Sequence, residues 1–295
     1  MLGRASKISA YVYGRPHASA GSREERMTRL VFGMNVNDAR IGFIGFGNMA
    51  SAMADGWIAS GAVPAGNMCA CAGRYEALVP RCEQRGMKAC ETSRQVVETS
   101  DVVVIAVKPY MIESVLAPLT DALEGKAILS VAAGWKCADY EHVIPGAHHL
   151  STVPNTPVAI NEGVIACERA STLAEAEHEL VFDLLKLLGS PVEVETHLLS
   201  VAGTVGGCSP AFIAMVIESL ADAAVKHGIP RAVAYEMVSQ MVAGTAKLQL
   251  ATGMHPGAMK DAVCSPGGTT IKGVAELEAA GMRSAFIRAI DVIEG

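Results

Sequence analysis

Short apolar runs alternate with longer amphipathic stretches from Ala39 through the first two thirds of the chain. Runs of four to seven apolar residues are typical of buried strands, and stretches with apolar positions three and four apart are typical of helices. The strands are expected at residues 41–44, 67–71, 87–89, 102–106, 127–131, 149–153, 164–167 and 191–194. The helices are expected at 48–60, 74–85, 111–123 and 173–188. This alternation predicts βαβ units in a mostly parallel sheet.

The pattern changes near His197, beyond which the sequence predicts helices and no strand. One helix is expected to begin with Ser209 as its N-cap and Pro210 at the first helical position, and to end before Gly228. A second helix is expected to begin at Pro230 and to end before Gly253.

These two helices carry little polar surface. The charged residues of the first, Glu218, Asp222 and Lys226, are four residues apart and therefore form one narrow stripe. A helical domain of about 95 residues cannot bury two such helices by itself. We therefore expect an obligate dimer with this domain at the interface.

The chain of 295 residues has a length typical of about two domains. The α/β pattern predicts a Rossmann-type dinucleotide-binding domain at 39–196 and an all-helical dimerisation and substrate domain at 197–295. Residues 1–38 are expected to be a disordered extension, either an arginine-rich transit peptide or a segment upstream of a start near Met34. Glu24 and Glu25 favour the second interpretation, because transit peptides contain few acidic residues.

Composition narrows the range of functions. A net charge of −6 disfavours a nucleic-acid or membrane-surface partner, and no apolar run reaches the ~18 residues that span a bilayer. The eight cysteines form no C-x-x-C pair and no set with zinc-ligand spacing, so no metal is expected. Reduced thiols in a core are typical of a cytoplasmic protein.

The first expected strand is followed by a glycine turn and a helix. Gly45-x-Gly47-x-x-Ala50 fits the dinucleotide-binding fingerprint: Gly45 permits a tight turn, Gly47 leaves room for a pyrophosphate, and Ala50 allows close helix–strand packing. The free N–H groups at the helix start favour phosphate. The residues expected to contact the cofactor here are Gly45, Phe46, Gly47, Asn48, Met49 and Ala50.

The end of the second strand bears on cofactor choice. An NAD site usually has an acidic residue there, whereas this chain reads Cys71-Ala72-Gly73-Arg74. Arg74 is available to pair with a 2′-phosphate, which favours NADP, with NADPH preferred and NADH possible. The alternative is that Arg74 is a solvated residue in the first turn of the next helix.

Two further strand ends complete the expected cofactor site, since ligands of open α/β sheets bind beyond the carboxyl ends of the strands. Lys108 would contact ribose or phosphate, or else be an ordinary surface lysine. The residues concerned are Ala106, Val107, Lys108 and Pro109 after one strand, and Ala132, Ala133 and Gly134 after the next.

A Pro-Gly-Gly loop precedes a helix expected to start near Thr269. Such a loop exposes consecutive backbone N–H groups that can bind a carboxylate, and Thr269 and Thr270 add hydroxyls. An ordinary glycine loop with a threonine N-cap is the alternative. The chain shows no Ser-His-Asp set and no histidine base, which suits a protonated imine as hydride acceptor, because its positive charge already activates the carbon.

These motifs together resemble the pyrroline-5-carboxylate reductase family over residues 41–293. The shared segments are Gly42–Met49, Ala106–Pro109, Ala132–Gly134, Pro154–Pro157, Ser209–Phe212, His255–Gly257 and Lys260–Thr270. The resemblance implies reduction of 1-pyrroline-5-carboxylate to L-proline, the last step of proline biosynthesis, by a homo-oligomer built from dimers.

The resemblance also implies roles for individual residues. The substrate carboxylate would be held by backbone N–H groups in a segment containing Val263, Ser265, Gly267, Gly268 and Thr269. The Thr270 hydroxyl would bind the imine nitrogen as the catalytic group. Ser93 and Ala72 stand at positions near the adenosine where family members often have other residues. The preference between NADPH and NADH is therefore left open.

Two other functions remain compatible with the sequence. One is a reductase of another small imine or of a β-hydroxyacid, in which a catalytic lysine is expected on a helix of the second domain; Lys226 and Lys247 are the candidates. The other is a non-catalytic NADP-binding sensor. The carboxylate loop next to Thr270 argues against a sensor, which has no use for it.

Overall fold

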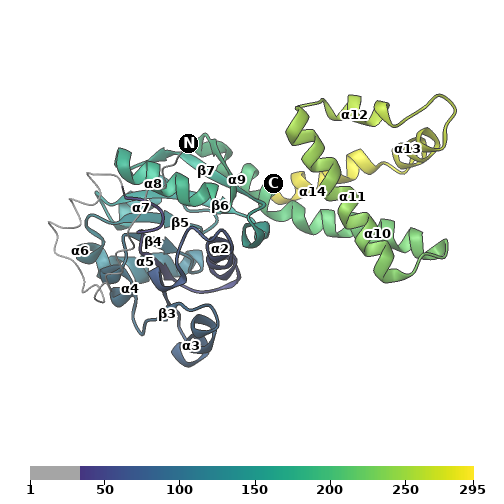
Figure 1. The fold of residues 1–295 in the computed structure, drawn as a ribbon. Helices are drawn as coiled ribbons and strands as arrows, with labels where there is room; N and C mark the ends of the chain where they lie inside the picture. Colours follow the sequence, from purple (N-terminus) through teal and green to yellow (C-terminus); the bar gives the residue numbers. More distant parts are fainter. Residues whose placement is uncertain (1–33) are drawn as a thin grey trace, which may run out of the picture.

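The computed structural model describes residues 34–295, as a sheet-containing part followed by a helical part that projects from it (Figure 1). The expectation of a disordered extension therefore falls, for residues 1–33, outside the described residues. The two parts meet where the last strand ends at Val194 and helical structure begins at Thr196.

One eight-stranded sheet organises the first part. Its order is β3-β2-β1-β4-β5-β6-β7-β8. The strands are β1 (Ile41–Ile44), β2 (Met68–Cys71), β3 (Lys88–Ala89), β4 (Val102–Ile105), β5 (Ala127–Ser130), β6 (His148–Pro154), β7 (Gly163–Ser171) and β8 (Gly189–Val194). The first six are parallel, β7 runs antiparallel to β6, and β8 is parallel to β7. The order of the first six strands is that of a Rossmann sheet, which confirms the predicted mostly parallel α/β class.

Helices cover both faces of the sheet, and an apolar core lies under each layer. One layer contains α2 (Asn48–Ala59), α3 (Tyr75–Glu83) and α8 (Glu175–Lys186). The other contains α4 (Ser93–Thr99), α5 (Ile112–Leu116), α6 (Thr120–Leu123) and α7 (Cys137–Val143). In the first layer, the buried Trp57 donates from its indole nitrogen to the Leu184 carbonyl at 2.8 Å, which joins α2 to α8.

Three features of this part differ from the prediction. The helix expected at 111–123 is divided into α5, a 3-10 turn (Ala117–Leu119) and α6, because Pro118 cannot donate a backbone hydrogen bond. The short helices α4 and α7 were not predicted. The start of α4 does have a sequence signal, a capping box in which the Thr92 hydroxyl accepts from Gln95 N and the Gln95 side chain accepts from Thr92 N.

A single long helix leads out of the sheet. It comprises a 3-10 turn (Thr196–Leu198), α9 (Leu199–Gly203), a π-helical turn (Thr204–Cys208) and α10 (Ser209–Lys226). The prediction that Ser209 is an N-cap was wrong, because Ser209 has helical dihedral angles within this continuous helix. The π turn lies just before Pro210, which has no backbone N–H to donate. Its altered hydrogen-bonding pattern accommodates the missing donor, so the helix continues through Ser209 and Pro210.

The remaining helices are α11 (Arg231–Thr252), α12 (Pro256–Ala262), α13 (Thr269–Ala279) and α14 (Met282–Glu294). The predicted end of α11 is confirmed, because Gly253 caps it in the left-handed conformation. Helices α10 and α11 pack against each other, yet Ala221 and Ala234 are their only buried residues. Large apolar side chains on both helices remain exposed, including Met215, Met237, Met241 and Leu250. These helices therefore present an apolar surface that this chain does not cover itself.

Candidate cofactor and substrate site

Four segments with expected cofactor roles lie together at one edge of the sheet. They follow the carboxyl ends of β2, β1, β4 and β5, which are consecutive neighbours in the sheet. Arg74 follows β2, Gly45 follows β1, Ala106 follows β4, and Ala132 follows β5. The fold thus brings together at one edge the four segments that the sequence singled out for the cofactor.

The turn between β1 and α2 is built to approach an anion. Gly45 has φ +90°, and its N–H donates to the Cys71 carbonyl at 3.0 Å. A Cβ atom on Gly47 would find no atom within 4 Å, so open space lies beside the turn. The first backbone bond at the start of α2 runs from Ser51 N to Gly47 O, so the N–H groups of residues 48–50 have no backbone partner among the described residues. Donors and open space at a helix start fit the pyrophosphate of a dinucleotide.

Phe46 anchors this turn. Its ring is buried, contacts Phe43 edge-on at 5.5 Å between centroids, and lies beneath the Arg81 and Arg85 guanidinium groups at 5.2 and 5.7 Å. Because Phe46 and Ala50 both belong to the core, a cofactor can meet them only through the backbone.

Arg74 is the cation that remains available beside this turn. It is exposed, it immediately precedes α3, and within residues 34–295 no acidic side chain pairs with it. By contrast, Arg81 donates to the Ser51 hydroxyl at 2.7 Å and Arg85 pairs with Asp55 at 2.6 Å. Lys108 is likewise exposed, at the end of β4. After β5, Ala132 is buried, whereas Gly134 is exposed with φ +82°.

The loop before α13 forms a tight turn. Gly268 N donates to Ser265 O at 3.0 Å across Pro266 and Gly267, and Gly267 has φ +69°, as a type II turn requires. Val263 N also has an internal acceptor, the Lys260 carbonyl at 3.2 Å. Consecutive free N–H groups, as predicted, are therefore found at Thr269 and Thr270 but not along the whole loop, because those of Val263 and Gly268 are bonded internally.

The donors that remain in this loop are those of Ser265 and Gly267 and of the consecutive pair Thr269 and Thr270, none of which has a backbone acceptor among the described residues. Thr269 and Thr270 open α13, whose N-terminal partial charge favours an anion. Lys260 and Asp261 form an exposed pair at 2.7 Å, as expected of a solvated pair.

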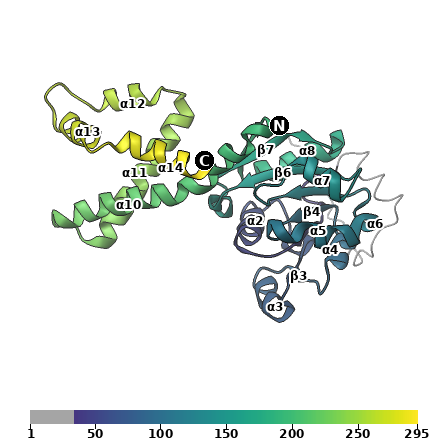
Figure 2. The same ribbon diagram turned by 180° about the vertical axis from the view of Figure 1, so that it is seen from behind.

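Within one chain, this loop and the cofactor edge are not brought together. Figures 1 and 2 show α13 on the side of the helical part that faces away from the sheet, with α12 along the upper edge of that part. In this arrangement, a site that uses both groups of residues would be completed by a second chain or by a movement of the helical part.

Two further polar residues have structural partners within the chain. The Asn155 amide donates to Gly206 O at 3.0 Å, and its oxygen accepts from Val164 N at 3.0 Å, so Asn155 fixes the loop after β6 to the π turn. Lys247, a candidate catalytic lysine, pairs with Glu162 at 2.9 Å.

Comparison with known proteins adds the family to this geometry. A family model described as pyrroline-5-carboxylate reductase dimerisation matches residues 196–294, and one described as NADP oxidoreductase, coenzyme F420-dependent, matches residues 40–134. The pyrroline-5-carboxylate reductase of Treponema pallidum is 40% identical over 255 residues, which are 85% of this chain and 97% of the relative. The chain belongs to the pyrroline-5-carboxylate reductase family. The Escherichia coli reductase is 36% identical over 255 residues, 86% of this chain and 95% of the relative.

Solved structures of pyrroline-5-carboxylate reductases share the fold. The Streptococcus pyogenes enzyme has a TM-score of 0.76 and 30% identity, covering 86% of this chain and 96% of that chain. A Plasmodium falciparum pyrroline carboxylate reductase with NADP bound has a TM-score of 0.78 at 24% identity, covering 88% of this chain and 96% of that chain.

The family match also bears on the long helix Thr196–Lys226. This helix is long and apolar enough to span a membrane by length and composition, and 11% of its most apolar window is buried within the chain. The dimerisation model covers the same residues. The apolar surface of this helix can thus be buried against a second protein chain instead of a membrane. The dimerisation match favours a homo-oligomer.

Proposed function

We propose that this protein reduces 1-pyrroline-5-carboxylate to L-proline with NAD(P)H, the last step of proline biosynthesis, in the cytoplasm. The observation that carries this proposal is the similarity to pyrroline-5-carboxylate reductases along almost their whole length, 97% of the Treponema pallidum relative.

The proposed cofactor is NADP, preferably as NADPH. Its pyrophosphate would lie beside Gly47 against the free N–H groups at the start of α2, and its 2′-phosphate would pair with Arg74. Segments 106–109 and 132–134 would line the remainder. The NADP bound in the Plasmodium falciparum structure supports this choice of cofactor.

The proposed substrate site is the loop before α13. Backbone N–H groups of Ser265, Gly267 and Thr269 would bind the substrate carboxylate, with Val263 and Gly268 shaping the turn. The Thr270 hydroxyl would hold the imine nitrogen and orient its carbon. Bound NADPH supplies the hydride. A protonated imine needs little further acid–base help, which agrees with a loop of backbone donors and hydroxyls.

The proposed assembly is built from dimers through residues 197–295, with 39–196 as the cofactor domain. The exposed apolar side chains of α10 and α11 would pack against the same helices of the partner. In such a dimer, the sheet edge of one protomer would meet the loop of its partner, which explains how a site divided within one chain becomes complete.

The direct test follows NADPH absorbance after addition of DL-1-pyrroline-5-carboxylate, with proline measured as product. NADPH oxidation that yields stoichiometric proline supports the proposal. NADPH binding without oxidation would favour the sensor, and turnover of other imines alone would favour a different reductase. Lys247, one of the two lysines considered for a β-hydroxyacid mechanism, forms an exposed ion pair with Glu162.

A further inference from the structure

A groove separate from the cofactor edge lies between α7 and β7. Its volume is about 600 Å³, and Cys137, Glu141, His148 and Glu168 line it together with three alanines, two threonines and a glycine. No residue with an expected cofactor or substrate role lines it. The groove needs its own explanation because two carboxylates face a largely apolar space.

Glu168 is the central group. It lies on β7 and is 1% exposed. Its Oε2 accepts from Cys137 N at 2.8 Å at the start of α7, whereas its Oε1 is buried and has no hydrogen-bond partner among the described residues. An unpaired buried carboxylate oxygen is costly, because folding removes its water without supplying a donor. A ligand with N–H donors would remove that cost.

Glu141 is held in the same manner near the other end of α7. Its Oε1 accepts from Gly146 N at 3.0 Å, in the turn that follows the helix. Backbone bonds thus fix one oxygen of each carboxylate, and the second oxygen of each has no hydrogen-bond partner among the described residues. Because Glu168 Oε1 is buried beneath the surface of the groove, a ligand would reach it once the side chain turns toward the groove. The alanines that line the space between the ends of α7 offer an apolar surface.

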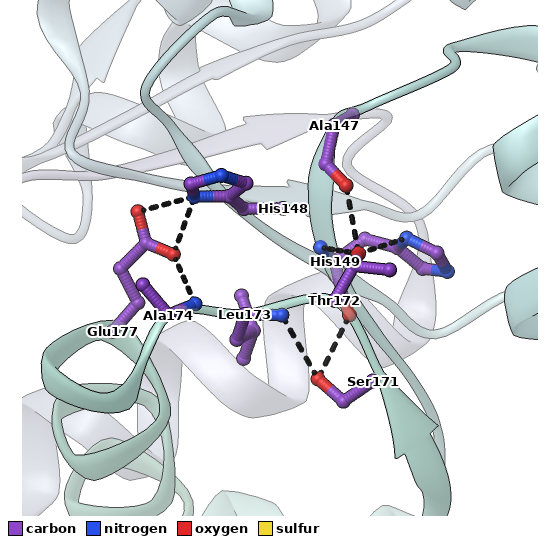
Figure 3. A network of polar contacts seen from close by, with 8 residues as sticks. All are labelled: Ala147, His148, His149, Ser171, Thr172, Leu173, Ala174 and Glu177. Carbon is purple, nitrogen blue, oxygen red and sulfur yellow. Dashed lines mark hydrogen bonds and ion pairs between the residues drawn. The ribbon is translucent and has the colours of Figure 1, made fainter.

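No lysine or arginine among the described residues pairs with these carboxylates. No lysine or arginine lines the groove, and Arg169, the neighbour of Glu168 on β7, pairs with Glu195. The His148 ring is already bonded to Glu177 at 2.8 Å, as Figure 3 shows. The pKa of the Cys137 thiol is raised by burial and, to a smaller extent, by Glu168 and Glu141, which agrees with a negative potential in the groove.

His149, the next residue on β6, does not supply the charge either. Burial lowers the pKa of its ring, which favours the neutral form, and its Nδ1 lies 3.0 Å from the Thr172 hydroxyl (Figure 3). The groove therefore combines two anchored carboxylates, an apolar floor and no lysine or arginine.

We propose that this groove binds the primary ammonium group of a linear aliphatic amine. The ammonium would donate to Glu168 Oε1, and its methylene chain would lie along the alanines toward Glu141. An ammonium has three donors and no acceptor, which matches a carboxylate that has only acceptors. Charge-assisted bonds of this kind are about twice as strong as neutral ones.

The test uses n-butylammonium chloride in isothermal titration against the full chain, with sodium chloride as the ionic-strength blank and 1-butanol as the neutral analogue. Glu168→Gln keeps an acceptor for Cys137 N but removes the charge, and Glu179→Gln removes an exposed charge from α8 as a matched control. We expect saturable binding by the wild type, at least about tenfold weaker binding by Glu168→Gln, and a change within about twofold for Glu179→Gln.

Thermal unfolding without amine checks that each variant is folded. Absence of binding to folded wild type, equal binding by folded Glu168→Gln, or equal binding of 1-butanol would each overturn the proposal. If Glu168→Gln does not fold, Ala170→Lys, which places a competing cation in the groove, takes its place, and unchanged affinity in that variant would also overturn the proposal.

Discussion

Gly45 lies so close to Ala106 that a Cβ atom added to Gly45 would be 2.7 Å from the Ala106 backbone carbonyl oxygen. The turn after β1 thus packs directly against the end of β4, and these two strands are neighbours at the centre of the sheet. Side chains essentially never approach a backbone oxygen so closely, and the φ of +90° at Gly45 is also unfavourable for any residue with a Cβ. The geometry of the cofactor turn therefore depends on glycine at this position.

Gly45→Ala is expected to destabilise the fold and to weaken NADPH binding together. The strained backbone and the contact with Ala106 should lower the free energy of unfolding by about 1–3 kcal/mol, measured by urea denaturation. Gly47→Ala is the matched control, because Gly47 has an extended backbone with φ −82° and no atom within 4 Å of the new methyl group. It should unfold like the wild type yet bind NADPH at least about tenfold more weakly, since the methyl group fills the pyrophosphate space. Unchanged NADPH affinity in Gly47→Ala would contradict the assigned position of the pyrophosphate.

Arg74→Ala should separate the two nicotinamide cofactors. If the guanidinium pairs with the 2′-phosphate, the KM for NADPH should rise about tenfold or more, and the KM for NADH should stay within about twofold. Steady-state kinetics with both cofactors measures this, and Lys186→Ala, which removes an exposed cation from α8, serves as the control. Equal effects on NADPH and NADH would show that Arg74 is only a solvated surface residue.

The sequence predicted those parts of the fold that depend on local pattern. All eight strands were predicted, because runs such as Val102–Ile105 are apolar on both faces, and the ends of α10 and α11 follow from Gly228 and Gly253. The start of the long helix could not be predicted, because it depends on tertiary packing: Gly203 and Gly206 lie against Val153 and Val164 of the sheet. That packing keeps Ser209 inside a helix whose local sequence favours an N-cap.

The candidate site likewise has features that the local sequence predicts and features that depend on tertiary structure. The sequence identified the cofactor segments, and the parallel sheet brings them to one edge, because they all follow carboxyl ends of neighbouring strands. The substrate loop was also identified, but its internal bond from Gly268 N to Ser265 O was not anticipated. Glu168 was not predicted, because a single acidic residue in a strand does not indicate which groups its side chain contacts or whether it is buried.

Thr270→Ala should lower kcat for 1-pyrroline-5-carboxylate about tenfold to a hundredfold, as expected for loss of one hydrogen bond to a charged group. Thr270→Ser keeps the hydroxyl and should recover most of the activity. Thr252→Ala is the control, since its exposed hydroxyl makes only local bonds, donating to the Leu248 carbonyl at 2.8 Å and accepting from Met254 N at 3.2 Å. NADPH affinity, measured by fluorescence, should be the same in all three variants. A Thr270→Ala enzyme with wild-type kcat would remove Thr270 from the proposed catalytic role.

Met241→Glu tests whether the helical part completes the site through a second chain. Met241 is 49% exposed on α11, and a carboxylate buried there at an interface would cost several kcal/mol, so the dimer dissociation constant should rise about a hundredfold or more. Light scattering should then find monomer at concentrations where the wild type is a dimer. The control is Ile160→Glu, which adds the same charge to an exposed apolar residue of the sheet-containing part and should leave the dimer intact.

The Met241→Glu monomer should still bind NADPH, because all the proposed cofactor residues lie in one chain, yet it should not reduce the substrate. Added in excess to the wild type, it should leave the specific activity of the wild-type dimer unchanged, because it cannot exchange into that dimer. A Met241→Glu monomer with full reductase activity would show that the loop before α13 reaches the cofactor edge of the same chain. The separation between α13 and the sheet in Figures 1 and 2 would then have to be bridged by a movement about the helix Thr196–Lys226 rather than by a partner.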